Sequence, residues 1–238
     1  GELYSTMNVM RMELAIAILL FSIPFIQRRQ WIRFLIIVFI AFLFHKSSIV
    51  FCIMYPLATI KYHKFITVAI IISAIVIASL GVTFFQFLTS TLEMYENYTE
   101  GQYFDEDRSL VAVSIGFVEK SLMLMMFYWT KYFEVPQYLN IVKNGKNNIS
   151  FAYLSNMAYW MVFAFAILSF TNNIMSRVSG YFSVLTIAMI PYAIRLLKNK
   201  DLRIALFVVL SIVMASERIV IWVLRPGWNS VVPYEWGF

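Results

Sequence analysis

The chain has 238 residues, of which 61% are hydrophobic and 13% are charged, about half the charged share of soluble domains. This composition excludes a water-soluble globular protein and indicates an integral membrane protein. The net charge of +6 does not indicate a nucleic-acid partner, because Lys and Arg lie between apolar runs instead of mixing with aromatic residues on one face.

The apolar runs predict an all-α fold, a polytopic transmembrane helical bundle. A spanning helix needs about 20 mostly apolar residues, and short polar breaks separate such runs along this chain. An eighth run, residues 47–60, is short enough to be re-entrant or tilted, and Pro56 would kink it. We therefore expect about eight spans. The seven clear runs are residues 9–26, 31–44, 65–88, 111–130, 151–170, 178–197 and 204–224.

The whole of residues 1–238 reads as one domain, because no linker or change of composition divides it. The chain opens with Gly1 and has no initiator methionine, so we expect it to continue a longer protein whose first helices precede it.

The basic residues predict the orientation, because Lys and Arg accumulate in cytoplasmic loops. With the N-terminus outside, 12 of the 19 Lys and Arg residues fall in inner loops and only four in outer segments. The longest outer loop, residues 89–110, is acidic. This distribution supports eight crossings and an external N-terminus.

Ionisable side chains near the outer ends of the spans indicate a site, because charge is costly at membrane depth. Arginines together with one histidine suit an anionic phosphate group, which guanidinium binds bidentately. Each arginine can equally reach a lipid headgroup and do no more, and the histidine can be merely interfacial. Glu119 and Lys120 lie deeper, either paired with neighbouring helices or on a proton or ion path. The outer group comprises Arg11, Glu13, His45, Arg177, Glu217, Arg218 and Arg225.

The motifs of soluble enzymes are missing from the sequence. It contains no HExxH, Walker or GxSxG pattern, and Cys52 is the single cysteine. We therefore expect no metal and no cofactor.

Four segments resemble the EpsG-like, Wzy-type polysaccharide polymerases. Asn8-Val9-Met10-Arg11 followed by Ala15 is similar to the family's first motif, although Met12 stands where the family usually has Gln. Ala41-Phe42-Leu43-Phe44-His45-Lys46-Ser47 matches its Ala-x-x-Phe-His-x-Ser pattern. Arg177 through Tyr181-Phe182 with Pro191, and the closing Pro233-Tyr234, complete the resemblance over nearly the whole chain.

The resemblance implies a bacterial inner-membrane enzyme that joins lipid-linked repeat units of an exopolysaccharide, capsule or O-antigen at the outer face. Glycan would pass from undecaprenyl diphosphate to a sugar hydroxyl. The implied partners are an undecaprenyl-diphosphate-linked oligosaccharide, membrane lipid and a chain-length regulator protein, with no nucleic acid.

The roles follow from this reaction. Arg11 and Arg177 would hold the diphosphate, because the leaving group is an anion. His45 would act as general base, with Glu217 as the second candidate. The candidates for substrate binding are Arg218, Arg225, Tyr181 and Ser48.

Two other functions stay open. A flippase or transporter of the same lipid should carry charge through the middle of the membrane, whereas most intramembrane charge here lies at one face. A membrane O-acyltransferase should offer a His or Ser to a cytoplasmic acyl donor, but His45 is predicted on the outer side.

Overall fold

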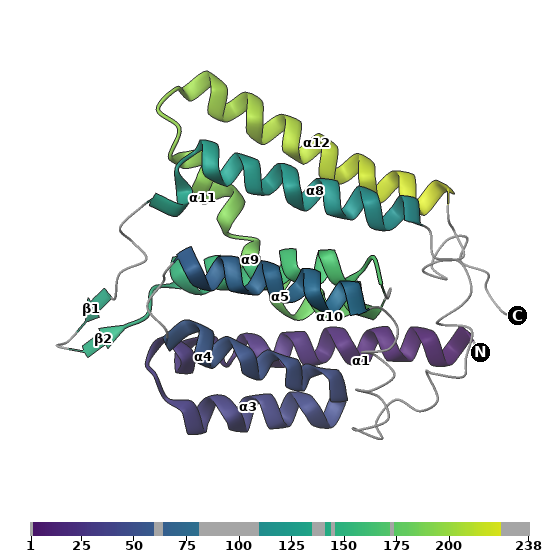
Figure 1. Ribbon diagram of the computed structural model, residues 1–238, viewed down its shortest axis with the longest axis vertical. Coiled ribbons are helices and arrows are strands. Elements are labelled where there is room, and N and C mark those ends of the chain that lie inside the picture. Colours follow the sequence, from purple (N-terminus) through teal and green to yellow (C-terminus); the bar gives the residue numbers. More distant parts are fainter. Residues whose placement is uncertain are drawn as a thin grey trace, which may run out of the picture.

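The fold is given by a computed structural model that describes residues 2–59, 64–80, 110–134, 141–143, 146–171 and 174–224. The described chain is mostly helical, as predicted, and the exception is one short hairpin (Figure 1). The elements are α1 (Glu2–Leu20), α2 (Ile23–Gln27), α3 (Trp31–Phe44), the 3-10 helix η1 (Lys46–Ile53), α4 (Met54–Thr59), α5 (Lys64–Leu80), α8 (Leu110–Trp129), the 3-10 helix η2 (Tyr132–Glu134), β1 (Ile141–Lys143), β2 (Lys146–Asn148), α9 (Phe151–Leu168), α10 (Ile174–Thr186), α11 (Met189–Arg195) and α12 (Lys200–Leu224).

Prolines account for the breaks in two of the three apolar segments that contain them. Proline donates no backbone hydrogen bond, and its ring clashes with the carbonyl group four residues earlier. Accordingly α1 ends at Leu20, four residues before Pro24. The segment before Pro56 adopts the 3-10 helix η1, of which only Cys52 and Ile53 lie within four residues of the proline, so Pro56 does not account for most of it. Before Pro191, α10 ends at Thr186, and α11 continues after a bend of 45°.

Each of the eight predicted runs contains at least one helix, but the helices differ in length. Within the described residues, Met10–Gln27 and Phe151–Leu168 are long and apolar enough to cross a membrane, and α10 with α11 makes a third if the bent pair is one span. Trp31–Phe44, Lys46–Thr59 and Thr67–Leu80 are apolar but shorter. The number of crossings therefore stays a prediction, as does the organisation of the chain as a single domain.

Helix α9 occupies the centre of the bundle (Figure 1). It packs against α10, α5, α8 and α4, and 72% of Phe151–Leu168 is buried, against 28% of Met10–Gln27. Aromatic rings join α9 to the neighbouring elements. Phe182 of α10 stacks on Phe165 of α9, with 5.6 Å between ring centroids, and on Phe51 of η1 at 5.8 Å. This stacking fixes η1 against α10, the pair of elements that carries the candidate site.

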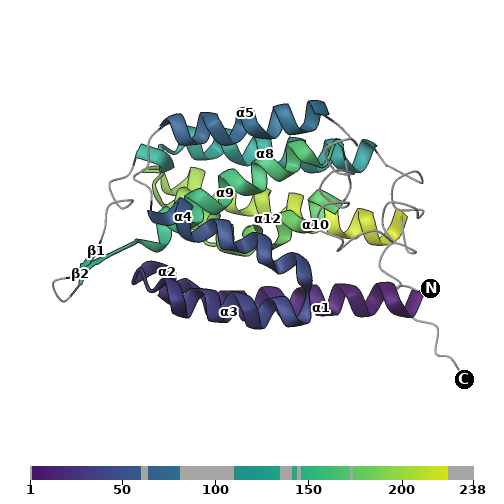
Figure 2. The same cartoon turned by 60° about the horizontal axis from the view of Figure 1, so that its bottom comes forward.

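The two ends of the bundle differ in composition. Strands β1 and β2 form an antiparallel hairpin, which the sequence analysis did not predict, with Val142 opposite Asn147. The hairpin extends from the end that also holds the α2–α3 and α11–α12 connections, whereas the N-terminus lies at the other end (Figures 1 and 2). Those connections contain Arg28, Arg29 and Lys198. The basic segments that the orientation argument places in the cytoplasm therefore share one end.

Candidate functional site

Helices α1 and α10 approach closely at Gly180. A Cβ atom added there would lie 2.9 Å from Met12 Cε and 3.8 Å from Ile16 Cδ1, so a larger side chain would displace Met12. Arg11 directly precedes Met12, and Arg177 precedes Gly180 by nearly one helical turn. The contact therefore brings these two exposed arginines to the same part of the α1–α10 interface. The family's usual Gln at position 12 is replaced here by a side chain that packs against α10.

His45 lies between α3 and η1, in the connection outside both helices. Its backbone is extended, with φ of −148° and ψ of 112°, and its N–H donates to the Ala41 carbonyl oxygen at 3.0 Å. This residue turns the chain from α3 into η1. Its half-buried imidazole ring lies 6.4 Å, centroid to centroid, from the ring of Tyr181 on α10. Tyr181 follows Arg177 by four residues, so the two side chains share one face of α10.

A hydrogen bond joins η1 to α10 beside this histidine. Ser47 Oγ and Tyr181 Oη are 2.8 Å apart, and Tyr181 is only 1% exposed. Sequence analysis assigned no role to Ser47, although it lies in the motif that contains His45. The hydroxyl two residues after His45 was visible in the sequence, but its partner was not, because the two residues come from distant segments.

The positive charges of two arginines act on His45. Burial lowers the pKa of His45 from its ordinary value of 6.5, and the positive charges of Arg11 and Arg177 lower it further. Arg177 also lies near the N-terminus of α10, where the helix dipole adds positive potential. The imidazole is therefore favoured in its neutral form near neutral pH, the form that a general base needs.

The positive charge of this site is not balanced within the described part of the chain. There, no carboxylate forms an ion pair with Arg11 or Arg177. Glu13 follows Arg11 by two residues, which places it about 200° around α1. Among the same residues, no group of three His, Cys, Asp or Glu side chains could hold a metal ion. The arrangement suits an anion bound by guanidinium groups beside a neutral imidazole.

Ser48 is the third residue after His45 and belongs to η1. Its side chain is fully buried, and its Oγ has no hydrogen-bond partner among the described residues. Its N–H donates to the His45 carbonyl oxygen at 3.0 Å. Leaving a buried hydroxyl unpaired costs about 1–3 kcal/mol, so this oxygen retains hydrogen-bonding capacity for a further group.

The last predicted residues are not brought into this cluster by any described contact. Glu217 and Arg218 belong to α12, and their side chains lie, together with Arg225, outside the described part of the chain. The acidic segment 89–110 also lies outside it, apart from the first residue of α8.

Glu119 and Lys120 on α8 form a separate charged pair. Lys120 Nζ lies 2.8 Å from Glu119 Oε2, and both side chains are partly buried. Tyr159 of α9 donates its hydroxyl to the Lys120 carbonyl oxygen. The two neighbours pair with each other, which the sequence analysis did not assume.

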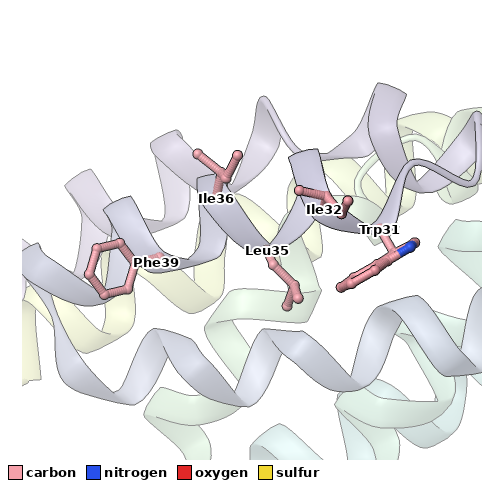
Figure 3. Close-up of a pocket in the computed structure, with 5 residues that line it drawn as sticks. All are labelled: Trp31, Ile32, Leu35, Ile36 and Phe39. Carbon is pink, nitrogen blue, oxygen red and sulfur yellow. The ribbon is translucent and has the colours of Figure 1, made fainter.

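An apolar groove of about 460 Å³ runs along the outward face of α3 (Figure 3). Trp31, Ile32 and Phe39 are more than half exposed there, whereas Phe34 on the opposite face is buried. The groove has no polar group that could perform chemistry, so its surface fits only hydrocarbon.

The sequence matches the EpsG family over residues 2–236, nearly the whole chain. The chain belongs to the EpsG family. This confirms the resemblance found in the motifs, and it supports a membrane protein of polysaccharide biosynthesis with a polymerase-like function. No curated protein and no solved structure matches this EpsG-family chain.

Proposed function

We propose that this protein is a glycosyltransferase-type polymerase of lipid-linked polysaccharide repeat units, the substrates on which an EpsG-family polymerase would act. The observation that carries the proposal is the meeting of Arg11, Arg177 and His45 where α1, α10 and η1 join. Two cations with no carboxylate partner among the described residues can bind an anion, and the diphosphate of a polyprenyl-linked glycan supplies one.

Arg11 and Arg177 hold the diphosphate in this mechanism. Guanidinium groups pair bidentately with phosphate oxygens and stay charged at any physiological pH. When the glycosidic carbon leaves the diphosphate, negative charge develops on the departing oxygen. Fixed positive charge at that position stabilises the transition state more than the ground state.

His45 takes the proton of the acceptor hydroxyl. The hydroxyl oxygen forms a bond to the anomeric carbon while the bond from that carbon to the diphosphate oxygen breaks. The proton passes to the imidazole, and the products are a glycan longer by one linkage and free undecaprenyl diphosphate. The lowered pKa of His45 keeps the imidazole unprotonated before the reaction. Glu217 is the second candidate for this base.

The remaining candidates would assist substrate binding. Ser48 is fully buried, so η1 would have to shift before its hydroxyl could donate to a substrate oxygen, which would supply the hydrogen bond that it lacks among the described residues. Tyr181 is only 1% exposed and lies beside His45, so it would act on the substrate through that histidine. Arg218 and Arg225 would extend the positive charge toward the second lipid-linked substrate.

The site faces the outside of the bacterial inner membrane in this proposal. The apolar helices support a membrane location, and the basic connections gathered at one end of the bundle support that end as the cytoplasmic one (Figure 1). All eight helical segments then belong to the membrane domain, and the N-terminus of the chain is external. A chain-length regulator protein is the expected protein partner.

The charged pair on α8 favours an enzyme over a flippase. A transport path needs charge that interacts with the moving headgroup, whereas Glu119 and Lys120 neutralise each other. An acyltransferase would need a donor to reach His45 from the cytoplasm, which the proposed orientation does not allow.

Reconstitution tests the proposal. The full-length protein is placed in proteoliposomes with undecaprenyl-diphosphate-linked repeat units isolated from cells that lack this polymerase. We expect longer lipid-linked glycans and one undecaprenyl diphosphate released for each new linkage. Arg177→Ala should strongly reduce both products, whereas Arg33→Ala, an exposed arginine at the opposite end of α3, should not. Movement of the lipid across the bilayer without any new linkage would contradict the polymerase proposal and indicate a flippase.

A further inference from the structure

Tyr181 is the side chain that joins the two halves of the site. Its ring lies beside that of His45, which directly precedes η1, and it follows Arg177 by about one turn on α10. The position of the imidazole relative to the guanidinium group therefore depends on where Tyr181 lies. A change in the Tyr181 side chain would alter the geometry between the two groups without removing either of them.

The Ser47–Tyr181 hydrogen bond fixes that position. Its two atoms are 2.8 Å apart and come from segments 134 residues apart in the chain. Ser47 is half-buried and Tyr181 is 1% exposed, so little water competes for the bond. Ser47 also follows His45 by two residues at the start of η1, where the 3-10 turn leaves little freedom between them.

The stacking of Phe182 on α10 takes place away from His45. Phe182, the residue after Tyr181, stacks on Phe51 of η1 and on Phe165 of α9. Phe51 lies six residues after His45 in the chain. These rings hold α10 against the bundle. The hydrogen bond acts nearer the beginning of η1, where the histidine is.

We propose that Ser47 and Tyr181 are positioning residues, whose hydrogen bond holds His45 at the separation from Arg177 that glycan transfer requires. The proposal rests on the proposed function, since it assigns to this pair the geometry of the same site. Neither residue performs a chemical step. Each acts through His45, so the pair should govern turnover more than substrate binding.

Kinetics of the reconstituted full-length protein test this role, with the undecaprenyl-diphosphate-linked repeat units described above as the probe. We expect Ser47→Ala and Tyr181→Phe each to lower kcat on the order of ten- to a hundredfold, with KM within about threefold, because misplacing a catalytic group by about 1 Å costs about a hundredfold. Ser47→Thr keeps the hydroxyl and should restore most of the rate.

The double variant provides the sharper measurement. Because both residues contribute to one bond, Ser47→Ala combined with Tyr181→Phe should be about as slow as the slower single variant. Ser79→Ala is the matched control, since Ser79 Oγ bonds the Ile75 carbonyl oxygen at 2.8 Å on an exposed face of α5. Its rate should equal that of the unmodified protein.

Three results would overturn the inference: unchanged kcat in both single variants, losses that multiply in the double variant, or losses that follow the melting temperature of the protein alone. These results are distinct from failure of the proposed function. If His45→Ala abolishes polymerisation while Tyr181→Phe does not, only the positioning role is wrong. If His45→Ala itself polymerises normally, the proposed site is wrong as well.

Discussion

Two groups of charged side chains within the apolar bundle differ in how their charge is balanced. On α8, Lys120 pairs with Glu119 at 2.8 Å, and the pair is neutral. At the junction of α1, α10 and η1, Arg11 and Arg177 have no carboxylate partner among the described residues. Burial lowers the pKa of the half-buried His45 most, and the positive charges of the two arginines lower it further. A neutral pair can stabilise packing without a ligand, whereas uncompensated cations create a site that an anion completes.

Removing the histidine should give the largest effect of all. His45→Ala leaves the two arginines in place but removes the base, so we expect turnover to fall roughly 10²- to 10⁴-fold, the usual contribution of general base catalysis. The reconstituted polymerisation assay measures it, with Arg33→Ala as the control. A loss of less than threefold would assign proton transfer to another group, with Glu217 the next to test.

Separating α1 from α10 should give the next largest effect. Gly180→Leu places a side chain where even a Cβ lies 2.9 Å from Met12, so it moves Arg11 away from Arg177, and we expect turnover to fall about tenfold or more. Gly116→Leu on α8 is the matched control, because a Cβ at Gly116 meets no atom within 4 Å. Met12→Ala combined with Gly180→Leu makes room again and should recover part of the rate. Equal loss in both glycine variants would contradict the role of this contact.

The pH dependence should show a smaller but specific change. A general base works only when unprotonated, so the rate falls as pH drops through the pKa of His45, and the lowered pKa places this loss below pH 6.5. Arg177→Ala removes one positive charge and should move the acid limb of kcat/KM to higher pH. Arg177→Lys keeps the charge, so its acid limb should stay near that of the unmodified protein. An acid limb identical in all three proteins would show that the charge of Arg177 does not affect the pKa of His45.

Changes to the pair on α8 should affect activity least. Glu119→Gln leaves Lys120 without its partner and should lower the melting temperature, because one charge then stays uncompensated. Glu119→Gln combined with Lys120→Met removes both charges and should recover most of that loss. Turnover should stay within about twofold in both variants, since structural substitutions outside a site rarely affect its chemistry. A transport defect in the double variant would instead revive the flippase.

The sequence predicted the helical fold well, because the apolar runs and the prolines act locally. Pro24 and Pro191 mark the breaks after Leu20 and Thr186, since a proline disrupts the helix within the preceding four residues. The 3-10 geometry of η1 and the β1–β2 hairpin escaped prediction. Neither has a periodic pattern that distinguishes it from an ordinary apolar helix or loop.

Candidate members of the site could be selected from the sequence, but their geometry could not. Charge and motif selected Arg11, His45 and Arg177, because ionisable groups are rare in apolar segments. Their meeting depends on Gly180 against Met12, and the link from Ser47 to Tyr181 depends on the same packing. Helix packing order sets these contacts, and no local pattern in the chain encodes it.

The most direct test of the central claim is the length distribution of lipid-linked glycan in the native bacterium. Cells with Arg177→Ala, His45→Ala or Arg33→Ala are compared at matched membrane abundance of the full-length protein. The account predicts single repeat units accumulating on the outer face in the first two variants, and long chains in Arg33→Ala. Normal long chains in Arg177→Ala and His45→Ala would contradict it, because an anion site made of these residues would then be dispensable for polymerisation.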